Sequence, residues 1–513
     1  MSPSGVASTV HDVLAVDSET FQENVREDAD RILEEINGGT FDNPQAIVGF
    51  EYEFYAVDDE GALARIPRRL LQYVGFEKEL GLHNAEMQTH PDPLNEDGLL
   101  AQESSVKSRL HAASRPMDAE GLHLVSDGMW TIPPDGQSAE AYLTSSVEKD
   151  GIRQATNMSD SARYHAMANT DPPPGMVIDL PHVTLEADTV MPESLITSIQ
   201  PHYQVPQAVD LPEYFRYAIR IAAFLLALGA STPFVPPDLY DDVDPYAILD
   251  DGWKENRIRL FETTLNVPGR TGKVRFPEDV GTVEDAIMAI AEDDVFVPMP
   301  VTETGRFDDE FAHFRMKHGT YWRWVRPVFD GQSRTNANAR IEFRPLSAQP
   351  TVRDSIAFQA VFVGLLEQLR QADHPLYELE WETAEANFYA AMRDGLDAEL
   401  TYITAAGAET TDRDRLYSDL FDQAQIGLRR RGLSGDTAAK YLWPLHRRAR
   451  SAITPADWKR NRVREYLDDG ADLEAAIYEM QLRYFEHQRR TLLSGTFTDW
   501  FDGRSTGESI RGL

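Results

Sequence analysis

Two glutamates stand at alternate positions in a short segment near the start of the chain. Glu51 and Glu53 are two residues apart in GFEYEFYAV, interleaved with Phe50, Tyr52 and Phe54. Successive side chains on a strand point to opposite faces, so both carboxylates would share one face and the aromatic rings the other. Carboxylates held side by side repel unless a cation lies between them, and Mg²⁺ takes such oxygen ligands together with phosphate and water. The pair therefore points to the chemistry of a hard divalent cation.

Three later segments repeat this alternation of an apolar and a polar face. The polar faces would carry Asn84, Glu86 and Gln88 in HNAEMQTH, Gln200, His202 and Gln204 in SIQPHYQV, and Arg340, Glu342 and Arg344 in ARIEFRPL. A half-solvated antiparallel sheet produces the same alternation, and for any single segment it is the simpler interpretation. The four segments together leave both interpretations open, a solvated sheet and a divalent-cation site.

These polar faces need a sheet to hold them and helices to cover its apolar side. The strand patterns fall in the first two-thirds of the chain, and helical spacing dominates from Val352 onward. The apolar spacing also predicts a helix over 9–37 and a strongly apolar core helix over 211–230. The C-terminal helices are predicted near 353–371, 378–397, 411–432, 436–450, 455–467 and 471–493. The sequence therefore predicts an α+β fold with a helical C-terminal part.

The chain divides into three parts on the same patterns. We expect an N-terminal helical segment over 1–44, a main domain over 45–495 and a tail over 496–513. The main domain would be strand-rich over 45–350 and helical over 351–495. Stretches that are loop-rich or acidic and punctuated by Pro and Gly predict surface insertions near 116–181, 232–252 and 264–310.

The overall charge is strongly negative and excludes some partners. The 513 residues carry a formal net charge of -36, and only eight of the 49 basic residues are lysine. Because the acidic residues are spread along the chain, we interpret them as a surface adapted to high salt rather than as a docking block for a basic partner. A nucleic-acid backbone would be repelled.

Several other classes of protein are excluded by missing signals. The chain has no cysteine, so disulfides, thiolate metal sites and cysteine nucleophiles are ruled out. The first residues lack the pattern of a signal peptide, and the longest apolar stretch is too short to span a bilayer, so we expect a cytoplasmic protein without a membrane partner. No P-loop motif and no zinc-binding histidine pair is present.

An ordered set of motifs resembles the carboxylate–amine ligases related to glutamate–cysteine ligase, within the glutamine-synthetase-like superfamily. The motifs are, in order, VGFEYEF, NAEMQTHPDPL, ARYHAM, SIQPHYQV, FLLALGASTPF, ENRIRLFE, TYWRWVRP, ARIEFRPLSAQPTV and ANFYAAMRDGLDAEL. The similarity spans roughly residues 45 to 490. Each motif alone is weak, but their order makes the set fairly specific. One departure is Pro201, which stands next to His202. Because proline lacks a backbone N–H, it predicts a strand edge or a bulge there.

The resemblance implies a cradle-shaped antiparallel sheet with flanking helices, whose concave face holds ATP and Mg²⁺, with Mn²⁺ as an alternative. Carried over to this sequence, it implies the metal ligands Glu51, Glu53, Glu86, His202 and Glu342. It implies nucleotide contacts for Gln200, Arg340 and Arg344, and catalytic roles for Arg344 on phosphate and Arg257 on phosphate or the substrate carboxylate.

The resemblance also implies the reaction. The γ-carboxylate of glutamate would attack ATP to give an acyl phosphate, and cysteine would then displace phosphate to give γ-glutamylcysteine, a step of thiol biosynthesis. A related ligase with another amine and a non-catalytic relative that binds nucleotide or metal remain as alternatives. A glycosidase with paired carboxylates is disfavoured, because four ligand-bearing strands exceed what that chemistry needs. The oligomeric state stays open.

Overall fold

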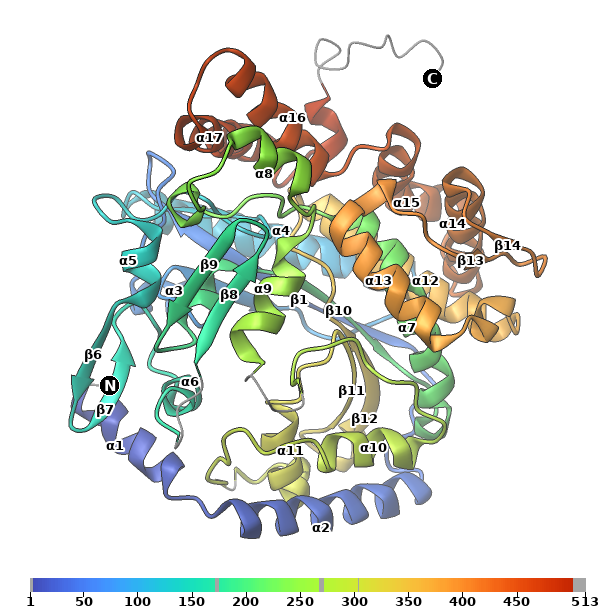
Figure 1. Cartoon of the computed structure of the whole chain (residues 1–513). Helices are drawn as coiled ribbons and strands as arrows, with labels where there is room; N and C mark the ends of the chain where they lie inside the picture. Colours follow the sequence, from blue (N-terminus) through green and yellow to red (C-terminus); the bar gives the residue numbers. More distant parts are fainter. Residues whose placement is uncertain (1–2, 171–174, 267–271, 303, 502–513) are drawn as a thin grey trace.

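An antiparallel sheet runs through the centre of the molecule and carries the polar faces that the sequence predicts (Figure 1). The computed structural model describes residues 3–170, 175–266, 272–302 and 304–501. The strand order is β11-β12-β10-β1-β3-β2, and two short strands, β4 and β5, also pair with β1. The strands are β1 (Ile47–Val57), β2 (Glu77–Lys78), β3 (Asn84–Gln88), β4 (Asp92–Pro93), β5 (His123–Val125), β10 (Ile199–Gln204), β11 (Val325–Asp330) and β12 (Asn338–Phe343). The predicted α+β class, with a cradle-shaped antiparallel sheet, is confirmed.

The register of the sheet places the polar residues of four strands on one face. Glu53 of β1 lies opposite Glu86 of β3, and Glu51 lies opposite Gln200 of β10. His202 lies opposite Glu342 of β12. The apolar residues that alternate with them are fully buried, among them Tyr52, Phe54, Tyr203 and Ile341. The alternation therefore separates a helix-covered apolar face from a polar face, as predicted.

The strand around Pro201 is central, so of the two predicted alternatives the sheet edge is wrong. A bulge is present: the register shifts by one residue between the Ser198–Ser347 bridge and the His202–Glu342 pair. β10 pairs with β1 on one side and β12 on the other. The N–H groups of Ile199 and Val205 donate toward the β12 side, to the carbonyls of Leu346 and Ala339, and position 201 faces the same way. The ladder with β12 includes His202 to Gln204 and leaves out Pro201. Proline has no N–H to donate, and at position 201 the ladder with β12 does not call for one. Proline can therefore occupy this interior strand.

Helices from the middle and the end of the chain cover the apolar face of the sheet (Figure 1). α7 (Leu211–Gly229) packs on β11 and β12 and is buried along nearly its whole length, which confirms the predicted core helix. The C-terminal helices agree with the prediction to within a few residues: α12 (Val352–Gln371), α13 (Trp381–Asp394), α14 (Arg413–Arg430), α15 (Gly435–Ser451), α16 (Pro455–Asp468) and α17 (Leu473–Thr491). α13 is shorter than predicted because Gly395, with φ of 54°, ends it and a 3₁₀ turn precedes it.

The N-terminal helical pattern forms two helices rather than one. α1 (Pro3–Leu14) and α2 (Ser18–Asn37) are separated at Asp17, whose carboxylate accepts a hydrogen bond of 2.8 Å from the N–H of Thr20 and caps α2. α2 ends at Asn37, as predicted, and packs against α10 (Val283–Ala291) and α11 (Ala312–His318) along the lower edge of Figure 1.

The three segments predicted as insertions contain regular structure of their own. The remaining elements are α3 (Arg68–Val74), α4 (Glu96–Asp118), α5 (Ala139–Thr144), β6 (Ser146–Lys149), β7 (Ile152–Ala155), α6 (Ala162–Met167), β8 (Met176–Leu180), β9 (Val183–Ala187), α8 (Pro245–Asp251), α9 (Asn256–Leu265), β13 (Tyr402–Ile403) and β14 (Glu409–Thr410). Residues 267–271 and 303 of the third segment, and 502–513 of the tail, lie outside the described residues. The division of the chain into parts stays a prediction.

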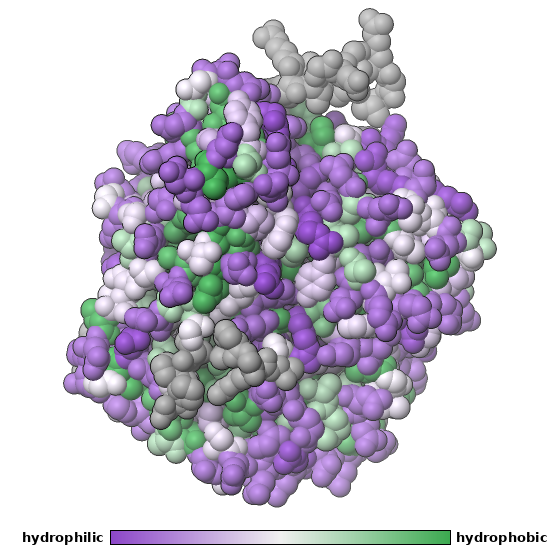
Figure 2. Space-filling view, viewed as in Figure 1, coloured by the Kyte–Doolittle hydropathy of each residue, from purple (hydrophilic) through white to green (hydrophobic). Residues whose placement is uncertain are grey.

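The visible surface is mostly hydrophilic, with apolar residues scattered in small groups (Figure 2). None of the described helices combines the length and the apolar character that crossing a bilayer requires.

A buried ion pair ties the C-terminal helices to the strand-rich part. Lys459 of α16 donates to both carboxylate oxygens of Asp127, each at 2.6 Å, and to the carbonyl of Ser231 at 2.9 Å. Gln481 of α17 donates to the same carboxylate at 3.1 Å. The exposed fractions of Asp127 and Lys459 are 0% and 2%, so neither charge has water as an alternative partner. The ion pair and its hydrogen bonds therefore join three segments that are far apart in sequence: those around Asp127 and Ser231, and the C-terminal helices.

Candidate active site

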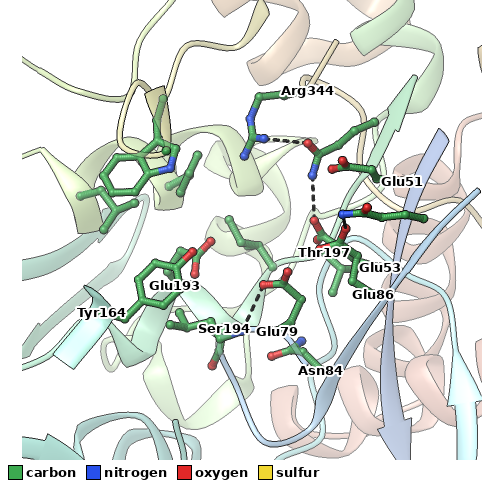
Figure 3. A pocket seen from close by; sticks show the side chains of 18 of the residues that line it. Glu51, Glu53, Glu79, Asn84, Glu86, Tyr164, Glu193, Ser194, Thr197 and Arg344 are labelled. Atoms are coloured by element: carbon green, nitrogen blue, oxygen red, sulfur yellow. Dashed lines mark hydrogen bonds between the residues drawn. The ribbon is translucent and has the colours of Figure 1, made fainter. Parts of the chain in front are cut away.

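A cavity of about 280 Å³ opens against the polar face of the sheet. Its wall carries five glutamates, two arginines and several aromatic side chains. They are Glu51, Glu53, Glu79, Glu86, Glu193, Arg326, Arg344, Tyr164, Phe261 and Trp322. In Figure 3, Glu51, Glu53 and Glu86 lie on one side, Glu193 and Tyr164 lie on the other, and Glu79 lies between them. The cavity is thus rich in negative charge, with its cations concentrated near Arg344.

Three predicted ligands come together at one end of the polar face. One ligand atom from each of Glu51, His202 and Glu342 lies within 4.8 Å of the other two. His202 Nε2 is 3.4 Å from a carboxylate oxygen of Glu51, and it is buried without a hydrogen-bond partner. Two carboxylates around an unpartnered ring nitrogen form a donor set that fits a divalent cation.

The ring of His202 carries a constraint on that fit. Arg340 Nε donates to His202 Nδ1 at 3.2 Å, and an arginine can only donate. A neutral ring in this arrangement has its hydrogen on Nε2, which faces Glu51. Coordination through Nε2 requires Arg340 to leave Nδ1 so that the hydrogen can move there. The two carboxylates fit a cation as they stand, and His202 joins them only after this exchange.

Glu342 anchors the arginines of the cavity. It accepts hydrogen bonds from Arg344 at 2.5 Å and forms an ion pair with Arg326 at 2.9 Å. Arg344 also donates to the side-chain oxygen of Gln200 at 2.7 Å. Burial raises the pKa of Glu342, but the two guanidinium groups outweigh it and hold that pKa well below its usual range. Glu342 is therefore ionised at neutral pH and fixes Arg344 at the cavity wall.

A second group of carboxylates lies beside the first. Glu53 accepts hydrogen bonds from the N–H and hydroxyl of Ser198, at 2.7 and 2.9 Å, and from Gln200 at 2.9 Å. Burial, then the neighbouring Glu79, raise the pKa of Glu53 to about 7. Burial, then Glu51 and Glu79, raise the pKa of Glu86 well above its usual value. Such a group holds either protons or a cation at neutral pH.

The raised pKa values predict how stability depends on pH when no divalent cation is present. Because an unfolded glutamate titrates near 4.5, the folded protein binds more protons than the unfolded chain between about pH 4.5 and 7. The stability that protonated Glu53 contributes is therefore present at the acidic end and lost as the pH rises through about 7. We expect Glu53→Gln to flatten the fall of the melting temperature over this window, measured by scanning calorimetry in EDTA.

Mg²⁺ provides the complementary measurement. It should raise the wild-type melting temperature more at about pH 8 than at about pH 6, since only the ionised carboxylates bind it. The exposed Glu186 of β9 offers a matched control, and Glu186→Gln should leave the slope unchanged. A Glu53→Gln variant with the wild-type slope would contradict the raised pKa.

Four predicted site residues, His202, Glu342, Arg257 and Arg340, do not line the cavity in the described part of the chain. His202 and Glu342 lie beside Glu51, whereas Arg257 and Arg340 are held by other contacts. Arg257 donates to the carbonyls of Arg344 and Pro345, both at 3.2 Å, and its guanidinium lies 5.4 Å from the ring centre of Trp324. Arg340 pairs with Asp330 at 2.8 Å besides its bond to His202. The roles of these two arginines in catalysis and in nucleotide binding stay predictions.

Four ionisable residues of the cavity were not predicted from the sequence, and only one had a usable signal. Arg326 stands between the buried Val325 and Pro327 in WRWVRPVFD, so a strand pattern was available there. Tyr164 lies on α6, and Glu79 and Glu193 lie between regular elements or in a short 3₁₀ turn. Nothing in the periodicity of the sequence marks these three positions as neighbours of the sheet.

Comparison with known proteins places the chain in a family. Residues 47–478 match the family described as Glutamate-cysteine ligase family 2. No curated protein matches the chain. Among solved structures, a glutamate–cysteine ligase from Francisella tularensis in complex with AMP is 14% identical, with 88% of this chain and 91% of that one covered and a TM-score of 0.48. A bifunctional glutathione synthetase from Pasteurella multocida is 16% identical, with 90% and 55% covered and a TM-score of 0.46.

Proposed function

The chain belongs to glutamate–cysteine ligase family 2, and we propose that it joins the γ-carboxylate of glutamate to the amine of cysteine with the use of ATP. One observation carries the proposal beyond the family. The cavity against the polar face of the sheet combines five carboxylates with two arginines, inside the residues that match the family. ATP with divalent cations complements this mixture, because the cations meet the carboxylates and the phosphates meet both the cations and the arginines.

The carboxylates named above would hold the cations. Glu51 and Glu342, with His202 after its exchange of partners, form one set, and Glu53 and Glu86 form another. Mg²⁺ bound there would neutralise charge on the phosphates of ATP during phosphoryl transfer.

Arg344 has the position and the support for a role in the transfer itself. Its guanidinium faces the cavity and is fixed by Glu342 and Gln200, so little reorganisation is needed when charge develops nearby. Arg257 holds the main chain at Arg344 and Pro345 from behind. In this arrangement the substrate carboxylate attacks the γ-phosphorus of ATP, giving an acyl phosphate and ADP. The amine then attacks the acyl carbon and phosphate leaves.

The proposal is tested by phosphate release from ATP in molar KCl, with glutamate and a panel of amines. The panel contains cysteine, ammonia, other amino acids and simple alkylamines. Release that depends on both glutamate and cysteine, with γ-glutamylcysteine identified by mass spectrometry, would support the proposal. Release with another amine only would keep the ligase chemistry and replace cysteine. The absence of release with every amine would contradict catalysis and favour a binding protein.

A further inference from the structure

Glu193 lies on the cavity wall away from the other carboxylates. It belongs to a short 3₁₀ helix, η1 (Met191–Leu195), that leads into β10. Figure 3 shows its carboxylate beside the ring of Tyr164, across the cavity from Glu51 and Glu53. Trp322, Phe261 and Leu265 also line the cavity and give it an apolar component.

The carboxylate of Glu193 differs from the other cavity carboxylates in its contacts. Glu342 is paired with two arginines, Glu53 accepts three hydrogen bonds, and Glu51 faces His202. Among the residues that the structure describes, none donates a hydrogen bond to the side chain of Glu193 or forms an ion pair with it. A half-buried carboxylate that faces a cavity without a partner is available to a ligand.

The surroundings also make Glu193 a suitable proton acceptor. Burial, then the charges of Glu79 and Glu53, raise the pKa of Glu193 to about 8. Because burial is the largest cause, a cation held by the other carboxylates relieves only the smaller part of this shift. A general base works best when its pKa lies close to the pH at which the enzyme operates.

The ligation chemistry leaves one task that the other cavity residues do not perform. A primary amine reaches the site as an ammonium ion, which has no lone pair and cannot attack an acyl phosphate. It must be bound as a cation and then lose a proton on a side of the cavity away from Arg344. Glu193 is the cavity carboxylate on that side, and none of the described residues engages its side chain.

We propose that Glu193 forms the amine subsite, where it binds the ammonium group of the second substrate and takes the proton that must leave before attack. The proposal rests on the ligase function proposed above and names the residue that activates the nucleophile. The ligand class is a primary amine that is protonated in solution. Tyr164 and Trp322 would bound the same subsite.

The step balances as follows. One N–H proton passes from the ammonium to the Glu193 carboxylate, which leaves the neutral amine with its lone pair. The nitrogen attacks the acyl carbon, and the bond from that carbon to the phosphate oxygen breaks with its electron pair on the oxygen. The second nitrogen proton passes to the departing phosphate, which leaves as hydrogen phosphate. Glu193 returns its proton to solvent when the amide product has left.

The test compares a protonated amine with hydroxylamine, which is largely neutral at about pH 7 and therefore needs no base before attack. Wild type, Glu193→Gln, Glu193→Asp and the exposed control Glu186→Gln are assayed with glutamate, ATP and Mg²⁺. Hydroxamate formation reports the acyl phosphate. Amide formation with cysteine, or with the amine that the panel identifies, reports the complete reaction.

We expect Glu193→Gln to keep hydroxamate formation within about 3-fold of wild type and to lose about 10²–10⁴-fold in amide formation near pH 7. The loss should shrink as the pH rises toward the pKa of the amine, because free amine then enters from solution. Glu193→Asp should recover part of the rate, and Glu186→Gln should behave as wild type.

Two results would overturn the inference while leaving the proposed function intact. One is wild-type amide formation in Glu193→Gln, and the other is an equal loss of hydroxamate and amide at every pH. If wild type itself forms no hydroxamate, the proposed function fails and this inference fails with it.

Discussion

Glutamate-dependent ATP turnover should fall by about 10²–10³-fold when Glu342 is replaced by glutamine. Glu342 fixes Arg344 at 2.5 Å and pairs with Arg326 at 2.9 Å, and it contributes one of the three converging ligand atoms of the candidate cation site. Glutamine keeps the shape but removes the charge and turns an NH₂ group toward a guanidinium or a cation. The concentration of Mg²⁺ that gives half-maximal turnover should rise in the same variant, measured by coupled ADP release.

Glutamine is preferred to alanine here because the two substitutions test different things. Both substitutions remove the charge beside Arg326 and Arg344, but Glu342→Ala also removes the side-chain oxygen at this position that can accept from these half-buried guanidinium groups, so its cost approaches the roughly 3–5 kcal/mol of a broken buried pair. Loss of activity would then be confounded with loss of fold. Glu186→Gln serves as the matched control on β9, and near-ultraviolet circular dichroism checks the packing of both variants. Turnover of Glu342→Gln at the wild-type rate would remove Glu342 from the site.

The largest effect on stability is expected at the buried pair of Asp127 and Lys459. Lys459→Met leaves the Asp127 carboxylate, with an exposed fraction of 0%, without its countercharge. The bonds from Gln481 and the N–H of Gly128 satisfy oxygen lone pairs but do not neutralise the charge. We expect a loss of about 3–5 kcal/mol in the free energy of unfolding, measured from guanidinium denaturation.

A double variant separates the coupling energy of the two charges from the contribution of their surroundings to stability. Replacing Asp127 by Asn together with Lys459 by Met removes both charges, and it should recover most of the stability that the single change loses. Lys440→Met, on the exposed face of α15, is the matched control and should change stability by less than about 0.5 kcal/mol. Equal losses in the single and the double variant would show that the two charges are not coupled.

Local periodicity was enough to predict the elements that carry the site, but not the way they meet. The alternation in GFEYEFYAV predicts β1 and its two faces, because one strand face is buried by helices and the other is polar. The position of α7 follows from its apolar length. By contrast, Pro201 left a sheet edge and a bulge as alternatives, since sequence alone does not reveal which neighbour its missing N–H would face.

The site residues divide in the same way. Glu51, Glu53, Glu86 and Glu342 lie on regular strands, so their common face could be predicted. The structure brings the first three to the cavity wall and places Glu342 beside Glu51, where it holds Arg344. Glu193 reaches that cavity from a short 3₁₀ turn, whose direction depends on contacts with distant segments. The inward turn of Arg257 toward main-chain carbonyls likewise follows from tertiary packing, which no motif encodes.

The strand order has a consequence for how the protein is made. β10 pairs with β1, about 150 residues earlier, and with β12, about 140 residues later, so its partners leave the ribosome at widely separated times. Lys459, which neutralises Asp127, is synthesised later still. Contacts of such sequence separation close slowly, because long loops must be ordered first. The sheet of the nascent chain therefore stays incomplete until β12 has been synthesised, and the C-terminal helices that cover it follow only then.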